Sequence, residues 1–516
     1  MNLTQPLHSA AYVAPRATAM ILANGKRSWS ALYERVSRLA GGLRRLGVCA
    51  GMPVGILSTN SAEYLEYYLA VWWSGAVVLP LNSRWTAAEN AYAIRDSGAE
   101  VLLVSREFLP QIGEIRAAAT TLMALIYLGE DETPDGLVSY EALATKSEPV
   151  ADAERKDEDL AGIYYTGGTT GLPKGVMLSH RALWTTSLMF SKEFCMDSAT
   201  RYLHAAPMFH LADGAGGLAT TMVGGAHAFC RTFSPSEFIR CVDQHKITHS
   251  ILVPAMLGMV LDHESFHAEK LGSLQTLIYG ASPMPAGILR KALERLPNVG
   301  FVQIYGQTEL GALISVLSPG DHYLESTKLR SAGRAASGVQ IRIVDDCGVD
   351  VPRGSVGEVI ASSPGVMSGY WKKPEETAAT LTHGWVHTGD GAYLDEDGFL
   401  NIADRLKDMI VTGGENVFSV EVENALSTHP GVAQVAVFGV PSEDWGEAVH
   451  AMVVPRPGYE VSEKALSEHC SALIANYKRP KSFTIRDEPL PLSGAGKILK
   501  RELRKPFWAG RERAVN

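Results

Sequence analysis

Apolar and polar residues follow a helical period and then a strand period in turn along the first part of the chain. Apolar side chains recur every three or four residues over 32–46, which predicts an amphipathic helix. The short apolar run from Val54 to Leu57 is typical of a buried strand. A second helix is expected from about Ser61, followed by a strand over 77–79. The pattern therefore predicts an alternation of helices and strands.

The same alternation continues further along the chain. Thr86 and Glu89 form a capping box that predicts the start of a third helix, and residues 101–104 read as the next strand. A strand over 276–279 and a helix from about Ala286 repeat the pattern later. Strands that alternate with helices of this length indicate βαβ units and a largely parallel sheet.

The last third of the sequence has a different pattern. Residues 338–397 are rich in Gly, Pro and Asp-containing turns, which predicts a small β-rich subdomain. A final unit is expected from about Arg405, with helices over 419–427 and 462–474 and a strand over 434–439. We therefore predict an α/β fold. Its large N-terminal domain, residues 1–404, has two βαβ-type subdomains and the β-rich one, and a small α+β domain covers 405–516.

Length, composition and charge narrow the class of protein. A chain of 516 residues exceeds the roughly 250–300 residues at which single cores stop growing, so several domains are expected. The net charge of −9 argues against a nucleic-acid partner. The six cysteines include no CxxC pair and no metal-ligand spacing, which indicates free thiols in a reducing compartment. The N-terminus has no signal-peptide pattern, and no apolar run is long enough to cross a membrane. We expect a cytoplasmic protein.

The densest candidate for phosphate binding is the segment Tyr164-Tyr165-Thr166-Gly167-Gly168-Thr169-Thr170-Gly171-Leu172-Pro173-Lys174-Gly175. Its glycines let backbone N–H groups approach a polyphosphate, and its threonines and lysine add donors and charge. A Walker A loop needs Gly directly before Lys and Ser or Thr after it. Here Pro173 precedes Lys174 and Gly175 follows it, so the segment is a phosphate loop of another kind.

Because of this segment, the sequence resembles the adenylate-forming superfamily, which comprises acyl-CoA synthetases, adenylation domains and firefly-type luciferases. The resemblance covers nearly the whole chain, and the whole-chain likeness is greatest to bacterial fatty-acyl-CoA and feruloyl-type CoA ligases. Five further motifs follow in the family's order: Ala206-Pro207-Met208-Phe209-His210, Tyr279-Gly280-Ala281-Ser282, Gln303-Ile304-Tyr305-Gly306-Gln307-Thr308-Glu309, Trp385-Val386-His387-Thr388-Gly389-Asp390, and Asp404-Arg405-Leu406-Lys407-Asp408 with Gly413-Gly414-Glu415. A sixth is Pro491-Leu492-Ser493-Gly494-Ala495-Gly496-Lys497.

The resemblance implies an AMP-forming acyl-CoA synthetase that uses ATP, Mg²⁺ and coenzyme A. The implied nucleotide-binding residues are Thr166, Gly167, Gly168, Thr169, Thr170, Gly171, Lys174, Gly280, Ala281, Ser282, Tyr305, Gly306, Asp390 and Arg405. Tyr305 would stack on adenine, and Asp390 would accept the ribose hydroxyls. Thr308 would contact phosphate, and Glu309 with Thr166 would help to hold Mg²⁺.

The resemblance also divides the chemistry between the two domains. Lys497 is expected to neutralise charge at the α-phosphate and Arg405 to clamp phosphate or ribose, so that Lys497, Glu309, Thr308 and Arg405 form the catalytic set. The C-terminal domain is expected to be mobile about a hinge at Lys407. That rotation would bring Gly413, Gly414 and Glu415 beside CoA.

The acyl pocket is expected along His210, Leu211, Asp213, Gly214 and Gly306. Small residues after His210, which include Gly216 and Gly217, suggest room for a bulky or long acid. Asp213 is a candidate acceptor for a substrate phenol, with a capping or solvent-facing role as the alternative. An aromatic or arylpropenoic acid is favoured slightly over a medium- to long-chain fatty acid.

Some positions depart from the pattern that is common in the superfamily. Gly167 stands where many relatives have Ser, Gln307 where Met is frequent, Asp404 where Gly is frequent and Ser493 where Thr is frequent. None of these departures removes a charged catalytic group. They leave the reaction rate and the identity of the acid undetermined, but they do not change the expected class of reaction.

Other readings remain open at this point. A stand-alone adenylation enzyme would pass the acyl group to a carrier protein instead of CoA, although none is expected to be fused to this chain. A non-catalytic nucleotide-binding protein is disfavoured because Lys497, Glu309 and Asp390 are all present. A luciferase-like oxygenase is disfavoured by the sequence as a whole. The oligomeric state is open, a homodimer included.

Overall fold

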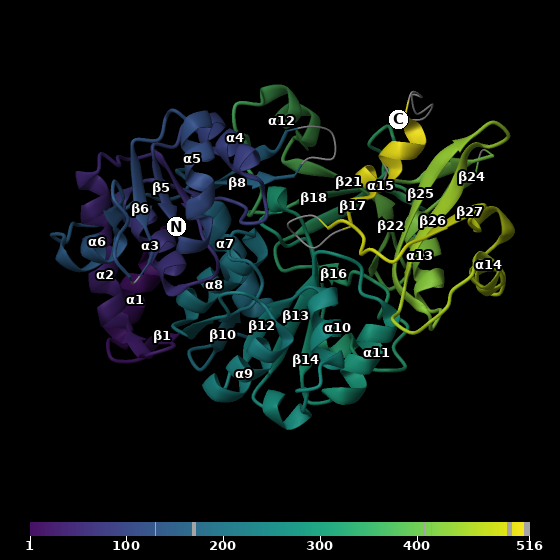
Figure 1. Ribbon diagram of the computed structural model, residues 1–516, viewed down its shortest axis with the longest axis horizontal. Helices are drawn as coiled ribbons and strands as arrows, with labels where there is room; N and C mark the ends of the chain where they lie inside the picture. Colours follow the sequence, from purple (N-terminus) through teal and green to yellow (C-terminus); the bar gives the residue numbers. More distant parts are fainter. Residues whose placement is uncertain (130, 168–171, 406–407, 414, 493–497, 510–516) are drawn as a thin grey trace.

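The computed structural model describes residues 1–129, 131–167, 172–405, 408–413, 415–492 and 498–509. Within these ranges the chain forms a mixed α/β fold with four sheets (Figure 1). A large N-terminal part holds three of the sheets, and a small C-terminal part holds the fourth. The predicted fold class is confirmed.

The first sheet has eight strands and lies at the N-terminal end of the molecule. In spatial order the strands are β19 (Gly369–Tyr370), β9 (Lys174–Ser179), β8 (Leu160–Thr166), β4 (Val77–Pro80), β3 (Pro53–Leu57), β5 (Val101–Val104), β6 (Ala124–Tyr127) and β7 (Val138–Ser139). The pairings from β8 to β7 are parallel, as the βαβ pattern predicts, and β9 and β19 are added in antiparallel orientation.

The second sheet has nine strands. They are β16 (Arg334–Ala335), β15 (Ser315–Leu317), β14 (Gly300–Tyr305), β13 (Thr276–Gly280), β12 (His249–Leu252), β10 (Arg201–His204), β11 (Ala226–Phe229), β1 (Thr18–Leu22) and β2 (Gly25–Ser28). The chain thus begins in this sheet, leaves it to build most of the first sheet, and then returns.

Helices cover both faces of these two sheets. Around the first sheet lie α1 (Gln5–Val13), α2 (Trp29–Arg45), α3 (Ala62–Ser74), α4 (Ala87–Ser97), α5 (Leu109–Ala118) and α6 (Tyr140–Lys146). The second sheet carries α9 (Pro235–His245), α10 (Pro254–Asp262) and α11 (Ala286–Arg295) on one face. The helices α7 (His180–Glu193) and α8 (Leu211–Val223) pack on both sheets, because each contributes to the core of either sheet.

Strand periodicity explains why each sheet has two cores. In β5, Val101 and Leu103 belong to the core shared with α2 and α3, whereas Leu102 and Val104 face α4 and α5. Successive side chains of a strand point to opposite faces, so a strand covered on both sides is apolar throughout. The continuous apolar runs in the sequence are therefore central strands of covered sheets.

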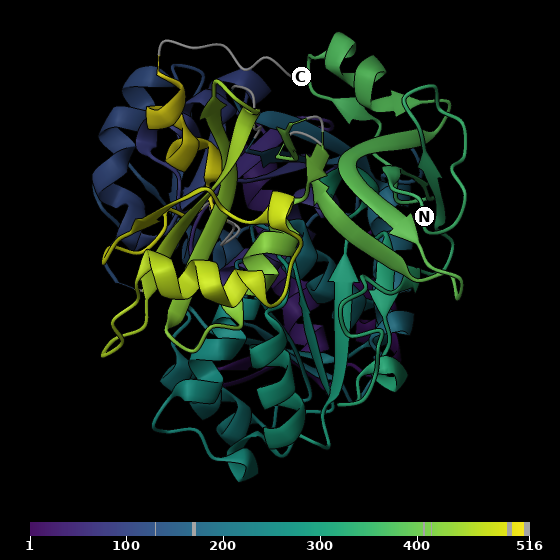
Figure 2. The same cartoon turned by 90° about the vertical axis from the view of Figure 1, so that its right-hand side faces the viewer.

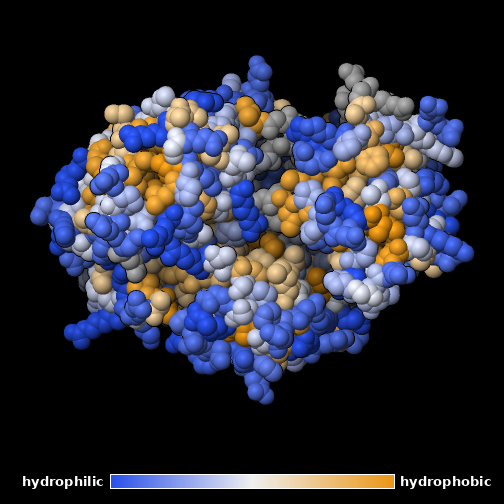
Figure 3. Space-filling view, viewed as in Figure 1, coloured by the Kyte–Doolittle hydropathy of each residue, from blue (hydrophilic) through white to orange (hydrophobic). Residues whose placement is uncertain are grey.

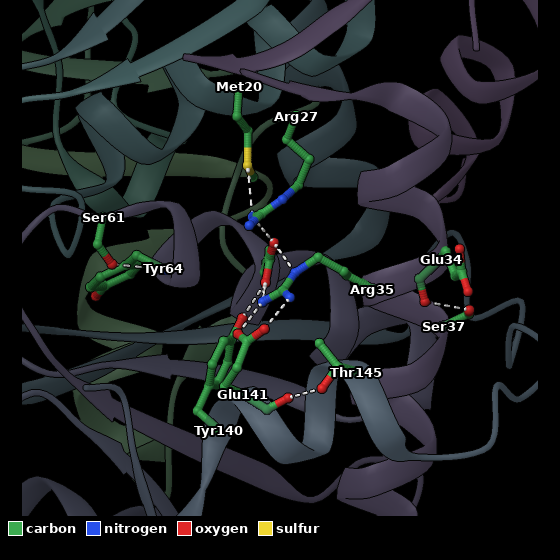
Figure 4. A network of polar contacts seen from close by, with 11 residues as sticks. Met20, Arg27, Glu34, Arg35, Ser37, Ser61, Tyr64, Tyr140, Glu141 and Thr145 are labelled. Carbon is green, nitrogen blue, oxygen red and sulfur yellow. Dashed lines mark hydrogen bonds and ion pairs between the residues drawn. The ribbon is translucent and has the colours of Figure 1, made fainter. Parts of the chain in front are cut away.

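A buried carboxylate ties α3 to its neighbours. Glu66 is fully buried and accepts hydrogen bonds from the Tyr140 hydroxyl at 2.5 Å and from Nε of Arg35 at 2.9 Å, and it also pairs with Arg27. Figure 4 shows Arg27, Arg35 and Tyr140 converging from three different elements. Arg35 also pairs with Glu141 at 2.8 Å. A buried charge is tolerated because it is fully paired.

The third and fourth sheets are small. The third contains β17 (Gln340–Val344), β18 (Gly357–Ser362), β21 (Trp385–Leu394), β20 (Leu381–Thr382) and β22 (Leu400–Arg405), with α12 (Pro374–Thr380) beside it. The fourth contains β24 (Glu415–Val417), β23 (Ile410–Thr412), β26 (Gly446–Pro455), β25 (Val432–Ser442) and β27 (Ser482–Ile485), with α13 (Ser419–Ser427), α14 (Glu463–Ser471) and α15 (Lys500–Arg504). The chain passes from the third sheet to the fourth between residues 405 and 410. In Figure 2 the C-terminal sheet faces the viewer.

The surface is hollowed between the C-terminal part and the rest of the molecule on the face seen in Figure 3. All six cysteines are free. Within the described ranges, no helix is both long and apolar enough to cross a membrane.

Candidate functional site

The predicted phosphate loop connects two paired strands. β8 ends at Thr166 and β9 begins at Lys174, and these two residues are partners in the antiparallel ladder. The Thr166 hydroxyl donates to the carbonyl of Lys174 at 3.5 Å, and Gly167 is exposed. A strand–loop–strand arrangement differs from the strand–loop–helix of a Walker A motif, as the sequence predicted. Gly168, Thr169, Thr170 and Gly171 lie outside the described residues.

The segment Gly280-Ala281-Ser282 turns sharply where β13 ends. A Cβ on Gly280 would lie 2.3 Å from the carbonyl oxygen of Ile304, so only glycine fits beside β14. Ala281 has a φ of 66°, a left-handed conformation that is uncommon for a residue with a side chain. Such strain is typical of functional sites. The turn brings the backbone of Ala281 and Ser282 to the carboxyl end of the second sheet, where ligands bind in open α/β sheets.

Tyr305 and Asp390 meet although they belong to different sheets. Tyr305 is the last residue of β14, Asp390 lies in β21, and the Tyr305 hydroxyl donates to Oδ2 of Asp390 at 2.7 Å. Gly306 follows Tyr305, and a Cβ there would lie 2.3 Å from the carbonyl oxygen of Ala312. The predicted adenine and ribose contacts thus lie side by side.

Tyr370 joins two predicted site residues that are far apart in the sequence. Its hydroxyl donates to Oε1 of Glu309 at 2.8 Å, and Nζ of Lys174 lies 4.8 Å from its ring centre. Burial, together with the Glu309 carboxylate, raises the pKa of Tyr370 above its usual range. Thr308 directly precedes Glu309 in a short 3₁₀ turn, Thr308–Leu310.

Sequence reasoning missed Tyr370. Residues 369–370 form β19, which pairs with β9 and thereby carries the tyrosine to the phosphate loop. The only local signal is a Gly-Tyr-Trp run, and Gly369 has a φ of 137°. The contact with Glu309 joins residues 61 positions apart, and no periodic pattern in the sequence predicts it.

The predicted acyl segment lies between β10 and α8. His210 is the N-cap residue of α8, and its ring centre lies 4.2 Å from that of Phe209. Leu211 is buried at the first position of the helix. A Cβ on Gly214 would make only ordinary contacts, the nearest at 3.5 Å with the Tyr68 hydroxyl. His210, Leu211 and Gly214 therefore share the N-terminal end of α8.

Asp213 has protein partners of its own. It is fully buried, its Oδ2 lies 2.6 Å from Nδ1 of His204, and its Oδ1 accepts from the Tyr202 hydroxyl at 3.1 Å. His204 continues the chain of contacts to His227 at 3.1 Å. The alternative of a solvent-facing Asp213 is wrong, and these partners lend no support to a contact with the acyl group.

The small residues of α8 do not all leave open space. A Cβ on Gly216 would lie 2.5 Å from the Tyr202 hydroxyl, and one on Gly217 would lie 2.8 Å from Cε1 of His204. The expectation that these two glycines make room for the acid is wrong. They let the helix approach β10 and the Tyr202 and His204 rings.

The predicted CoA-side loop packs on an aromatic ring. Gly413 has a φ of 59°, and a Cβ there would lie 2.7 Å from the indole of Trp445. The Gly413 amide donates to the Trp445 carbonyl at 2.9 Å, and Glu415 is exposed in β24. Gly414, the hinge candidate Lys407 and the catalytic candidate Lys497 lie outside the described residues.

The structure does describe the residues on either side of the segments that contain Lys407 and Lys497. Arg405 pairs through its backbone with Asp390, and its side chain lies outside the described part of the chain. Asp404 accepts a hydrogen bond from the backbone N–H of Ser419 at the start of α13. The loop that contains Lys497 is closed at its base by a bridge between Leu492 and Ile498.

Lys500 connects this loop to α13. Its Nζ lies 2.7 Å from Oε1 of Glu423 and donates to the Ser419 hydroxyl. Burial acts to lower the pKa of Lys500, but Glu423 and Asp404 outweigh it, and the pKa ends above its usual value. Lys500 therefore keeps its positive charge at neutral pH, while burial raises the pKa of its partner Glu423.

The arrangement suits a nucleotide with a divalent cation. Glu309 offers a hard oxygen ligand close to the phosphate loop, and Mg²⁺ is usually held by one or two carboxylates together with substrate phosphates. Among the residues that the structure describes, no group of three or more His, Cys, Asp or Glu residues could hold a metal alone. The Glu309 carboxylate fits the role of a ligand for Mg²⁺ that arrives with ATP.

Comparison with known families gives two matches. Residues 7–371 match the family described as AMP-binding enzyme, and residues 421–497 match the AMP-binding enzyme C-terminal domain. Together the two matches cover most of the chain, one on each side of the passage from the third sheet to the fourth.

Individual proteins are similar over nearly the full length. A feruloyl-CoA synthase of an Amycolatopsis species is 38% identical over 96% of this chain and 97% of its own. A fatty acid–[acyl-carrier-protein] ligase of Streptomyces coeruleorubidus is 35% identical over 97% of this chain and 95% of its own. Among solved structures, ATP-bound MatB from Rhodopseudomonas palustris is 31% identical, with a TM-score of 0.89 over 98% of this chain and 99% of its own.

Proposed function

The chain belongs to the AMP-binding enzyme family, and from that membership we propose that its site joins a carboxylic acid to coenzyme A through an acyl-adenylate. The reaction class is that of the AMP-forming acyl-CoA ligases, which use ATP, Mg²⁺ and CoA. The observation that carries the proposal is the contact of Tyr305 with Asp390, together with the contacts of Tyr370 with Glu309 and Lys174. The first contact supports a nucleoside-binding role for Tyr305 and Asp390, and the others support a phosphate-binding role for Glu309 and Lys174.

The first half-reaction needs no protein nucleophile. An oxygen of the substrate carboxylate attacks the α-phosphorus of ATP, the bond to the pyrophosphate oxygen breaks, and acyl-adenylate and pyrophosphate result. Tyr305 would hold the adenine and Asp390 the ribose, while Lys174 and Thr166 would lie along the phosphates. These groups accelerate the step by positioning the reactants and by offsetting negative charge.

Mg²⁺ would be held by Glu309, with Thr166 as the second candidate. When bound, it supplies positive charge to the phosphate oxygens. Tyr370 fixes the Glu309 carboxylate through a hydrogen bond of 2.8 Å, and such outer contacts orient metal ligands.

In the second half-reaction the CoA thiolate attacks the acyl carbonyl carbon, and AMP leaves. We place the boundary between the two domains at residues 404 and 405, with Lys407 as the hinge. Lys497 would serve the first half-reaction, and Gly413, Gly414 and Glu415 would approach CoA in the second. A Cβ at position 413 would lie 2.7 Å from the Trp445 indole, so glycine lets this loop pass close to that ring.

For the acid we propose an arylpropenoic compound of the ferulate type. The likeness to a feruloyl-CoA synthase over 96% of the chain supports this choice. A fatty acid is the second candidate, and a carrier protein is the second candidate for the acceptor, because the carrier-protein ligase is similar over 97% of the chain. The free thiols fit a cytoplasmic site of action.

The test is a panel of arylpropenoic, benzoic and fatty acids assayed with ATP and Mg²⁺. Pyrophosphate and AMP are measured with CoA, with an acyl carrier protein and with neither. We expect AMP and an arylpropenoyl-CoA as products. ADP with orthophosphate as the stoichiometric products would rule out the proposed reaction, and turnover with the carrier protein alone would favour the second acceptor.

A further inference from the structure

One buried amide holds the backbone of the acyl segment at three points. Nδ2 of Asn60 donates to the carbonyls of His204 at 3.0 Å and Ala206 at 2.8 Å, and its Oδ1 accepts from the Met208 amide at 2.8 Å. Asn60 belongs to the loop between β3 and α3, in the first sheet's part of the fold. The three points lie directly before Phe209 and His210, so Asn60 fixes how this segment leaves β10.

A buried tyrosine holds the same segment from α3. The Tyr68 hydroxyl donates to the Met208 carbonyl at 2.9 Å and is the nearest atom to a Cβ built on Gly214, at 3.5 Å. Burial raises the pKa of both Tyr68 and Tyr164, so both hydroxyls stay protonated at neutral pH. Tyr164 lies in β8, which leads into the phosphate loop. Tyr68 thus holds the acyl segment beside α8 and shares a core with Tyr164 of the phosphate-loop strand.

We propose that Tyr68 and Asn60 are positioning residues that set the shape of the acyl pocket and so determine which acids the enzyme prefers. The inference rests on the proposed function, because it takes 205–210 and the start of α8 as the pocket wall. A hydrophobic pocket distinguishes acids by fitting their volume, so a small displacement of its wall changes their relative rates. Neither side chain needs to touch the acid to have this effect.

The neighbouring Tyr67 provides a matched control. It is also fully buried on α3, but its hydroxyl donates to the Val54 carbonyl at 2.6 Å and accepts from the Leu79 amide at 2.8 Å. Both partners lie in strands of the first sheet, away from the acyl segment. Tyr67→Phe and Tyr68→Phe therefore delete the same atom from adjacent residues, and only the second removes a hydrogen bond to the acyl segment.

The experiment measures kcat/KM of the full-length enzyme for ferulate, 4-coumarate, octanoate and dodecanoate, together with KM for ATP and the Tm. In Tyr68→Phe we expect the ratio between the aryl and fatty acids to change about 2- to 10-fold, the range of one neutral hydrogen bond. KM for ATP should stay within about twofold because the nucleotide contacts are untouched. Tyr67→Phe should lower the Tm without changing the ratio.

Three results would overturn the proposal: unchanged acid ratios in Tyr68→Phe, equal changes in both variants, or a change in Tyr68→Phe confined to KM for ATP. If Tyr68→Phe does not fold, Asn60→Ala carries the same comparison, and a failure of both to fold would assign the two side chains to the fold alone. Failure of the wild type to use any acid would instead contradict the proposed function. The two failures are thus distinguishable.

Discussion

The hydroxyl of Tyr305 lies 2.7 Å from Oδ2 of Asp390 and connects the second sheet to the third. A carboxylate has about four lone-pair sites, so this bond is compatible with further bonds from two ribose hydroxyls. The contact also fixes the tilt of the Tyr305 ring, on which adenine would stack. One hydrogen bond thus prepares both halves of a nucleoside site.

Asp390→Ala should weaken ATP binding and leave the preference among acids unchanged. Buried ribose hydroxyls lose a charged acceptor worth roughly 1.5–3 kcal/mol, which corresponds to a rise of about 10- to 100-fold in KM for ATP. Tyr305→Phe, which keeps the ring and deletes only the hydroxyl, should raise KM for ATP less. Equal ATP dependence in folded Asp390→Ala and wild type would contradict the ribose assignment.

Tyr370→Phe should change the dependence on Mg²⁺. The variant removes the hydrogen bond that orients Glu309, and the loss of such an outer contact typically costs about 10- to 100-fold in metal affinity or activity. Pyrophosphate release measured against Mg²⁺ concentration should show a higher half-saturation point. Tyr127→Phe, which removes the bond to Asp131 far from the site, is the control. If pyrophosphate release depends on Mg²⁺ concentration in the same way in Tyr370→Phe and the wild type, the role of Glu309 as a metal ligand oriented by Tyr370 is contradicted.

Lys497 should matter for adenylation and hardly at all for thioester formation. Its charge is useful where negative charge develops on the α-phosphate, and loss of one such group typically costs about 10²–10³-fold in the affected step. Lys497→Ala should therefore nearly abolish acid-dependent pyrophosphate release, yet convert pre-made acyl-adenylate and CoA to acyl-CoA at close to the normal rate. Lys407→Pro should show the reverse, since a fixed φ would hinder rotation. Equal loss in both half-reactions would refute the division of roles.

Glu66 should be essential for stability and irrelevant to acid preference. Glu66→Ala leaves Arg35 and Arg27 without their buried partner, and removal of one member of a buried pair typically costs about 3–5 kcal/mol. Chemical denaturation should show this loss as a lower free energy of unfolding of the N-terminal part. Glu141→Ala removes only the exposed partner of Arg35 and should cost less than about 1 kcal/mol. A smaller loss for Glu66→Ala than for Glu141→Ala would show that the network is dispensable.

His450 should remain neutral well below pH 6. Burial lowers its pKa from 6.5 to about 4, and its ring nitrogens contact the hydroxyls of Ser482 at 2.7 Å and Thr484 at 3.1 Å. The unfolded chain takes up this proton near pH 6.5 and the folded chain only near pH 4, so stability present above pH 6.5 is lost as the pH falls through this window. An NMR titration of the His450 ring checks the value. A midpoint near 6.5 would contradict it.

Local patterns predicted the elements well. The capping box at Thr86 and Glu89 is present, and the helix expected over 419–427 has those bounds in the structure. These features depend on residues within one or two turns of each other, and such signals are visible in the sequence. The helix expected over 462–474 is shorter, with α14 ending at Ser471.

Contacts between distant residues were not predictable in the same way. Asn60 binds Ala206 across 146 residues, and Tyr140 binds Glu66 across 74. Such pairs depend on the order of strands in the sheets, which no local period encodes. The same reason explains the error at Gly216 and Gly217. Their small size is visible in the sequence, but the Tyr202 and His204 rings that fill the space are placed by sheet pairing.

The path of β1 and β2 limits how the molecule can be divided. These strands precede the whole first sheet in sequence yet belong to the second. No single cut therefore yields two complete halves of the N-terminal part. An exchange of the second sheet between homologous proteins needs junctions on both sides of residues 53–179 and a further one before β19, which returns to the first sheet. The chain enters the C-terminal sheet only once, between residues 405 and 410, so this sheet can be exchanged with a single junction. Recombination libraries of this protein should accordingly tolerate crossovers there far better than within the first 180 residues.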